Sequence, residues 1–179
     1  MRLFLAIDLP TKVKKQISNQ INMLKIDHPD FNWVEENNFH ITLFFLGEVM
    51  EPERVARKIK DALYDQEMFY LYSNEAGLFM NSKIVVYLGF RREKKTEELV
   101  NKVKQAFQIK DTKRFIPHLT LARYRIPSKQ QYFVLKKRLR SLKVNVEFPV
   151  KKLILFQSIL ETGRPFYKKI KSFELLPIK

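Results

Sequence analysis

The chain contains no cysteine, which excludes disulfides, a catalytic thiol and a zinc site held by cysteine. Only 4 of its 179 residues are glycine and 8 are proline, and no stretch rich in them divides the sequence. We therefore expect one domain over residues 1–179. No apolar run approaches the roughly 20 residues of a membrane span. The first apolar stretch is interrupted by Asp8 and stopped by Pro10, unlike a signal peptide. A soluble, cytoplasmic protein with no membrane partner is expected.

Acidic residues are in deficit, with 19 Asp and Glu against 34 Lys and Arg, for a net charge of +15. This excess favours an anionic partner, either nucleic acid or a nucleotide, over a membrane surface. Solvated helix faces are the alternative explanation for any single lysine. Hydrophobic residues make up 45% of the chain and aromatic residues 13%, so a packed core is expected.

Hydrophobic periodicity predicts an α+β fold. We expect strands at residues 2–9, 31–35, 39–46, 68–79, 84–90, 117–125, 143–149, 152–160 and 166–177. Helices are expected at 11–25, 52–64, 93–107 and 128–139, with Thr11 and Ser128 as N-caps. Turns are expected at Asn81-Ser82 and Gly163-Arg164-Pro165. A loose repeat of helix, strand, helix and strands predicts two pseudo-symmetric lobes of antiparallel sheet with outer helices.

Two tetrapeptides, His40–Leu43 and His118–Leu121, share the order His-apolar-Thr-Leu although the chain has only 3 histidines. Both lie in runs that read as strands, where residues two apart point to the same face. Each histidine should therefore project beside its threonine, one pair from each lobe facing a central cleft. Residues 2–9 carry a further candidate, Phe4, whose ring could stack on a nucleobase, although a phenylalanine there is more often part of the core.

Paired imidazoles suit the hydrolysis of a phosphodiester. In an in-line displacement one group activates the attacking oxygen, and another protonates the leaving oxygen on the opposite side of phosphorus. Histidine titrates near neutrality, so one ring can be neutral while the other is protonated, and each is worth roughly 10²–10⁴-fold in rate. Hydroxyls of Thr42 and Thr120 would donate to the non-bridging oxygens. The scheme needs no metal and no cofactor.

Arg123 follows His118 by five residues and is the next candidate. Its guanidinium offers a fork of donors suited to phosphate. Strict alternation places it on the face opposite Thr120, so a bend or bulge is required for it to reach a shared phosphate. A solvated arginine at a strand end is the alternative.

The sequence resembles the two-histidine (2H) phosphoesterase superfamily, and within it the RNA 2′,3′-cyclic phosphodiesterases, also called 2′-5′ RNA ligase-like proteins. The resemblance rests on segments spread over nearly the whole chain: Arg2–Pro10, Trp33 with Asn38–Glu48, Phe115–Arg123, and Leu155–Leu160 with Gly163 and Tyr167. One departure is Ser82-Lys83, where related sequences often have Pro-Arg. It leaves open a preference for RNA ends over small cyclic nucleotides.

The resemblance implies roles for the motif residues. His40 would be the proton donor to the ribose O3′, and His118 the proton acceptor that activates water, leaving a 2′-phosphomonoester. Thr42, Thr120 and Arg123 would bind the phosphate. The partners would be RNA ends with a 2′,3′-cyclic phosphate or related cyclic nucleotides, acted on by a monomer.

Two other functions remain open from the sequence. A ligase joining a cyclic phosphate to a 5′-hydroxyl through a 2′-5′ bond would need the same histidines. A basic RNA-binding module without catalysis would not need both imidazoles, and its binding would fall steeply with salt.

Overall fold

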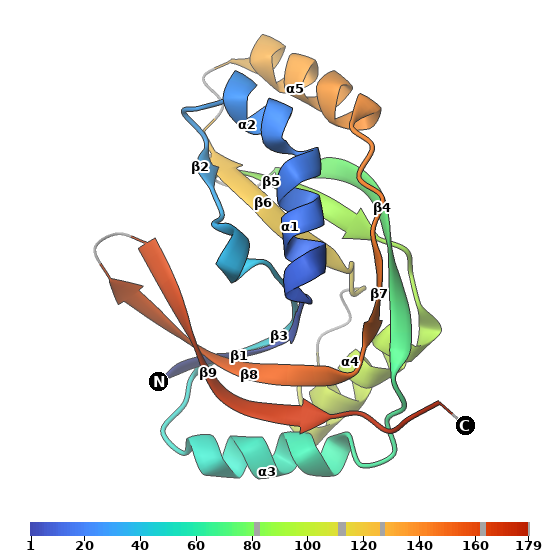
Figure 1. Ribbon diagram of the computed structural model, residues 1–179. Coiled ribbons are helices and arrows are strands. Elements are labelled where there is room, and N and C mark those ends of the chain that lie inside the picture. The colour runs from blue at the N-terminus through green and yellow to red at the C-terminus, as the bar shows by residue number, and fades with distance from the viewer. Residues whose placement is uncertain (81–82, 111–113, 126–127, 162–163, 179) are drawn as a thin grey trace.

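The computed structural model describes residues 1–80, 83–110, 114–125, 128–161 and 164–178, and it confirms the α+β prediction with a large antiparallel sheet (Figure 1). The strands are β1 (Arg2–Asp8), β2 (Asn32–Trp33), β3 (His40–Glu48), β4 (Phe69–Met80), β5 (Ile84–Phe90), β6 (His118–Tyr124), β7 (Glu147–Val150), β8 (Lys152–Glu161) and β9 (Arg164–Glu174). The helices are α1 (Thr11–Gln20), α2 (Asn22–Asp27), the 3₁₀ turn η1 (Glu36–Asn38), α3 (Pro52–Ala62), α4 (Lys94–Ala106) and α5 (Lys129–Ser141). Within these residues no helix is long and apolar enough to cross a membrane.

The two motif strands are neighbours at the centre of the sheet. The strand order is β7-β4-β5-β6-β3-β1-β8-β9, with β2 added to β6, and every pairing between these strands is antiparallel. We call β3, β1, β8 and β9 the first half-sheet, and β6, β5, β4 and β7 the second. The second half-sheet is continuous in sequence, whereas the first joins the two ends of the chain. Each half-sheet therefore contributes one motif strand to the central pair.

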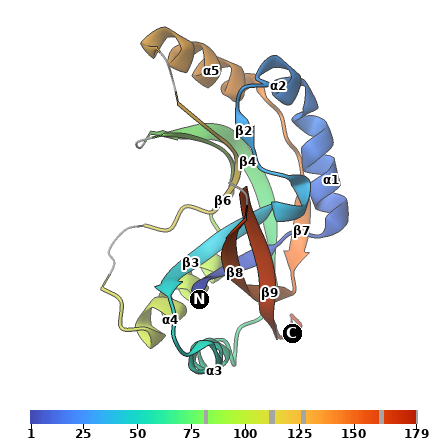
Figure 2. The ribbon, with the colours of Figure 1, turned by 90° about the vertical axis from the view of Figure 1, so that its left-hand side faces the viewer.

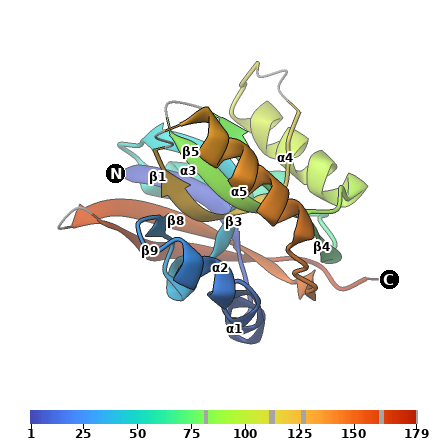
Figure 3. The ribbon, with the colours of Figure 1, turned by 90° about the horizontal axis from the view of Figure 1, so that it is seen from above.

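Helices cover the strands from several sides. Figure 1 shows α3 at one end of the molecule and α5 at the other, and Figure 2 agrees. Seen from above, α1 and α4 lie on opposite sides of the strands (Figure 3). Both helices contribute buried side chains to the main core, such as Ile17 from α1 and Leu99 from α4, each 0% exposed.

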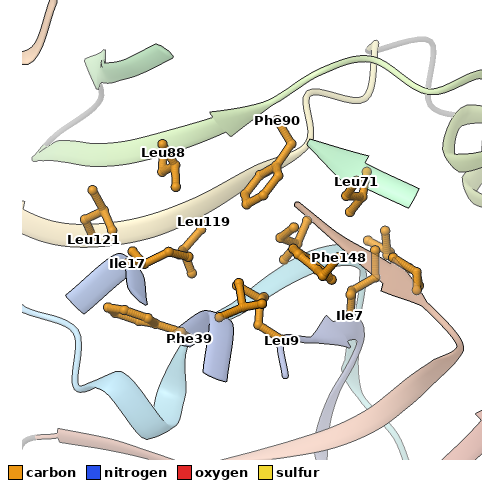
Figure 4. Close-up of a cluster of buried hydrophobic side chains, with 14 of the residues drawn as sticks. Ile7, Leu9, Ile17, Phe39, Leu71, Leu88, Phe90, Leu119, Leu121 and Phe148 are labelled. Carbon is orange, nitrogen blue, oxygen red and sulfur yellow. The ribbon is translucent and has the colours of Figure 1, made fainter. Parts of the chain in front are cut away.

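The main core lies against one face of the motif strands. Figure 4 shows Leu119 and Leu121 of β6 facing Ile17 of α1 and Phe39, the residue before β3. A smaller cluster on the other face of β1 contains Phe4, Ala6, Ile154 and Phe156, with Tyr167 packed against it. Strand β1 is thus buried on both faces, as its pattern of five consecutive buried residues shows.

The first helix differs from the prediction. It ends at Gln20, because Ile21 adopts φ −96° and ψ 3°, and α2 follows as a separate helix. This break leaves the predicted apolar stripe intact, since Ile21 and Leu24 stay buried. The assignment of Thr11 as N-cap was wrong: Pro10 is extended, so Thr11 is already the first helical residue. Ser128 is confirmed as an N-cap, because its hydroxyl accepts a hydrogen bond from the Gln131 amide at 3.3 Å.

Some strand limits also differ. The strand predicted at 143–149 forms only at Glu147–Val150, where β4 offers a partner, and the one at 31–35 only at Asn32–Trp33. Arg164 and Pro165 were predicted in a turn but pair with β8 as the start of β9. The predicted turn at Asn81-Ser82 and Gly163 lie outside the described residues.

Candidate active site

The two motif strands, β3 and β6, are paired at one position in the middle of the sheet. Ile41 pairs with Leu119 in antiparallel register, and both side chains are buried, at 0% and 1% exposure. Since alternate residues face opposite ways, the histidine and threonine of each motif point to the other face. Extending the register by one residue sets His40 opposite Thr120, and Thr42 opposite His118. The two histidines are then diagonal neighbours, a relation in which residues lie roughly 7–8 Å apart and their Cβ atoms somewhat closer.

A bulge in β6 brings Arg123 to the same face. Tyr87 pairs with Thr120 and Val86 with Ala122, so Leu121 is the extra residue. Leu121 and Ala122 are consecutive buried residues, and the alternation resumes one step out of phase. The bend that the sequence required for Arg123 is therefore present. The guanidinium lies within electrostatic reach of both imidazoles, since its charge contributes to lowering the pKa of His40 and of His118.

The first motif has a matching bulge, which the sequence did not reveal. Ala6 pairs with Thr42 and Leu5 with Phe44, leaving Leu43 as the extra residue. Phe45, five residues after its histidine as Arg123 is after His118, turns to the site face and is 70% exposed. The shared spacing of the two motifs was the signal that could have identified Phe45.

Both imidazoles are anchored in the same way. His40 Nδ1 lies 2.7 Å from the Asn38 carbonyl oxygen, and His118 Nδ1 lies 2.7 Å from that of Ile116. Because a carbonyl only accepts, Nδ1 carries the hydrogen and donates in both rings. In the neutral ring Nε2 then holds a free lone pair, and in the charged ring it holds a transferable proton. The two rings can therefore act as acid or base through equivalent atoms.

Burial favours the uncharged form of both rings. It is the main cause that lowers the pKa of His40 from 6.5 to about 4, against the hydrogen bond to Asn38. Nearby Lys14 lowers the pKa of His40 further, whereas the Asp8 carboxylate raises it. Burial also lowers the pKa of His118, again opposed by its backbone hydrogen bond. In the unliganded protein burial therefore favours the neutral form of both rings by lowering the pKa of each.

An ion-pair network adjoins His40, whereas the described part of the chain shows none beside His118. Asp8 pairs with His40 in the strand register, and its oxygens lie 2.7 Å from Lys14 Nζ and 2.6 Å from Lys169 Nζ. Burial opposes ionisation of Asp8, but hydrogen bonds from the two lysines leave its pKa below the usual value. Lys14 also donates to the Asn37 carbonyl at 2.8 Å, next to the residue that holds His40. The counterpart of Asp8 beside His118 is Gly89.

Aromatic rings flank both histidines. Ring centroids of Phe4 and Tyr167 lie 5.1 and 5.0 Å from that of His40, and Phe79 lies 4.9 Å from His118. Phe4 is 3% exposed and supports the His40 ring, so it presents almost no surface to a ligand. Its predicted contact with a nucleobase remains a prediction. Phe45, 6.0 Å from Phe4, offers the larger surface.

The described segments contain no group of three or more His, Asp or Glu side chains placed to hold a metal ion. A profile of the 2′-5′ RNA ligase superfamily matches residues 13–159. The chain belongs to this superfamily. The resemblance seen in the sequence is thereby confirmed.

Several superfamily members are similar over their full length. The RNA 2′,3′-cyclic phosphodiesterase of Methanocaldococcus jannaschii is 32% identical, over 97% of this chain and 100% of the relative. The RNA 2′,3′-cyclic phosphodiesterase of Thermotoga maritima is also 32% identical, over 94% of this chain and 92% of the relative. The crystal structure of Escherichia coli LigT complexed with 3′-AMP superimposes with a TM-score of 0.78, at 28% identity and 97% coverage of both chains.

Proposed function

We propose that the protein hydrolyses the terminal 2′,3′-cyclic phosphate of RNA to a 2′-phosphomonoester, with His40 as proton donor and His118 as proton acceptor. The observation that carries this proposal is the pair of motif strands, which present two imidazoles diagonally across the centre of the sheet, each held through Nδ1 and with no partner for Nε2 among the described residues. The activity named for relatives at 32% identity supports the same reaction.

The reaction proceeds by one in-line displacement. His118 Nε2 takes a proton from water as the water oxygen bonds to phosphorus, and the bond from phosphorus to O3′ breaks opposite it. His40 Nε2–H protonates O3′, and the phosphate stays on O2′. Donors from Thr42, Thr120 and Arg123 hold the charge that develops on the non-bridging oxygens. General acid–base steps of this kind contribute roughly 10²–10⁴-fold each.

The donor must be charged when the substrate is bound, although the unliganded ring is neutral. An anionic phosphate between the imidazoles favours the imidazolium form and raises its pKa. Asp8 contributes a carboxylate beside His40 that raises the pKa of that ring, but Lys14 lowers it more, so the choice of His40 as donor rests on the family resemblance. No metal or cofactor takes part in these steps. We propose that a monomer acts in the cytoplasm on RNA ends or related cyclic nucleotides.

The nucleobase is the remaining part of the substrate to place. We propose that the exposed ring of Phe45 stacks on the nucleobase. The buried ring of Phe4 would support this contact indirectly, because it packs against the rings of both Phe45 and His40. An increase in KM with little change in kcat, measured for Phe45→Ala on a cyclic nucleotide, would accord with this role. An unchanged KM would remove Phe45 from the site.

The test uses a short RNA ending in a 2′,3′-cyclic phosphate, incubated with EDTA. Wild type, His40→Ala and His118→Ala are compared, with His28→Gln as the matched control, since His28 lies at the end of α2 and stacks on Phe31. We expect a 2′-phosphate from wild type and the control, and at least a 10²-fold slower reaction from the other two.

Two outcomes would contradict the proposal. Tight, salt-sensitive RNA binding without turnover would indicate the basic binding module instead. Formation of a 2′-5′ bond in place of hydrolysis, when a 5′-hydroxyl RNA is added at low concentration, would indicate the ligase. The same histidines serve both reactions, so the product decides between them.

A further inference from the structure

A groove of about 490 Å³ begins beside His118 and runs toward α5. Its wall includes Tyr87, whose ring centroid lies 5.8 Å from that of His118, and Gly89, which pairs with His118 in the sheet. Ile116, whose carbonyl holds the His118 Nδ1 atom, and Pro117 complete this end. The groove thus adjoins residues that neighbour His118, although His118 itself does not line it, and it shares no residue with the phosphate-binding set.

Two glycines in the wall of the groove allow the Tyr87 ring and the backbone of β4 to pack closely against them. A side chain at Gly77 would place its Cβ 2.7 Å from the Tyr87 hydroxyl oxygen, because the Tyr87 ring lies across that position. A Cβ at Gly89 would come within 3.0 Å of the Glu75 carbonyl oxygen. Strand β4 is irregular here, since its register with β5 shifts between Ser73 and Ala76. Close backbone approach is a use for which glycine is suited.

The groove is lined by more positive than negative charge. Four of its residues are basic, namely Arg92, Arg114, Lys136 and Arg140, whereas Glu75 is its only acidic residue in the described chain. Arg92 pairs with Glu97, and Lys136 lies over the Tyr132 ring at 5.8 Å. Arg114 and Arg140 are exposed and form no ion pair with any described residue. Two arginines are therefore available to an anionic ligand.

Basic side chains interleaved with aromatic rings bind single-stranded nucleic acid, because the cations follow the phosphates and the rings stack with bases. Here Tyr87 and Tyr132 are half-buried in the same groove as the arginines. We propose that this groove binds the ribose-phosphate backbone of RNA beyond the cyclic phosphate, so that the enzyme prefers oligonucleotides to cyclic mononucleotides. This inference rests on the proposed function and extends it to a substrate class.

The experiment compares Arg114→Gln/Arg140→Gln with a control, Arg57→Gln/Lys60→Gln, that removes the same charge from exposed positions of α3. Helix α3 lies at the end of the molecule opposite α5 (Figures 1 and 2). The substrates are 2′,3′-cyclic AMP and an eight-nucleotide RNA ending in a 2′,3′-cyclic phosphate.

We expect Arg114→Gln/Arg140→Gln, the groove variant, to hydrolyse 2′,3′-cyclic AMP as fast as wild type does. On the RNA its kcat/KM should fall about tenfold, mainly because KM rises. The slope of log kcat/KM against log salt should become shallower by about 1.4, since each phosphate contact to a single strand contributes about 0.7. The control should keep both values close to those of wild type.

Equal losses on the two substrates, or no loss on the RNA, would overturn the groove proposal. Failure of the proposed function is distinguishable, because wild type would then hydrolyse neither the RNA nor 2′,3′-cyclic AMP. A 5′-hydroxyl RNA without a cyclic phosphate should inhibit hydrolysis of 2′,3′-cyclic AMP by wild type more strongly than by the groove variant. Equal inhibition of the two proteins would also overturn the groove proposal.

Discussion

The buried position of His40 makes the stability of the protein depend on pH. The pKa of His40 is about 4 in the folded chain and about 6.5 in the unfolded chain. Between these values the unfolded chain binds a proton that the folded chain does not, so acidification favours unfolding. Linkage gives a loss of about 2 kcal/mol between pH 7 and pH 5, and about 3 kcal/mol once the pH reaches 4.

Urea unfolding at pH 7, 6 and 5 measures this loss. Other groups add to the total, including Asp8, whose lowered pKa acts in the same direction. The comparison is therefore between wild type and His40→Gln, which retains every other titrating group. We expect the free energy of unfolding of wild type to fall by about 2 kcal/mol more than that of the variant over this range. Equal pH dependence in the two proteins would refute the burial argument, as would an imidazole that titrates near 6.5 by NMR.

The remaining predictions concern the chemistry around the two imidazoles. Replacing Thr42 or Thr120 by valine should lower kcat by about 10²-fold in single-turnover experiments, and an unchanged kcat would exclude phosphate contact. Arg123→Lys should fall between wild type and Arg123→Gln in kcat/KM, because lysine keeps the charge but loses the fork of donors. Asp8→Asn should lower the pKa of His40 further, since it removes the nearby negative charge, and NMR titration of His40 checks this; a purely structural role would leave that titration unmoved.

The site face of β6 shows what a single sequence can and cannot predict. Alternation in His118–Leu121 correctly places histidine and threonine together, because a strand's period of two is a local property. The same rule stated that Arg123 needs a bulge, and the consecutive buried pair Leu121 and Ala122 supplies it. The alternation of the sequence therefore shows that a bulge is needed before Arg123. Only the register between β5 and β6 shows that Leu121 is the extra residue.

Features that depend on long-range pairing were not predictable. Asp8 gains importance because β1 pairs with β3 and places it opposite His40, and Lys169 reaches it from the far end of the chain. The groove beside His118 likewise brings Arg92, Arg114 and Arg140 together from separate segments. The break at Ile21 was missed for another reason, since its apolar spacing continues unchanged through both helices.

The joining of the two chain ends in the first half-sheet has a consequence for synthesis on the ribosome. All strands of the second half-sheet have been made once residue 150 has emerged from the ribosome. Strand β1, in contrast, cannot pair with β8 until β8 has also been made. Until then β1 has one open edge, whose unpaired backbone groups can recruit strands from other chains. Phe156 and Tyr167, which pack around His40, also follow residue 150 in the chain. A chain that ends at residue 151 would carry both catalytic motifs and yet leave one of them unsupported.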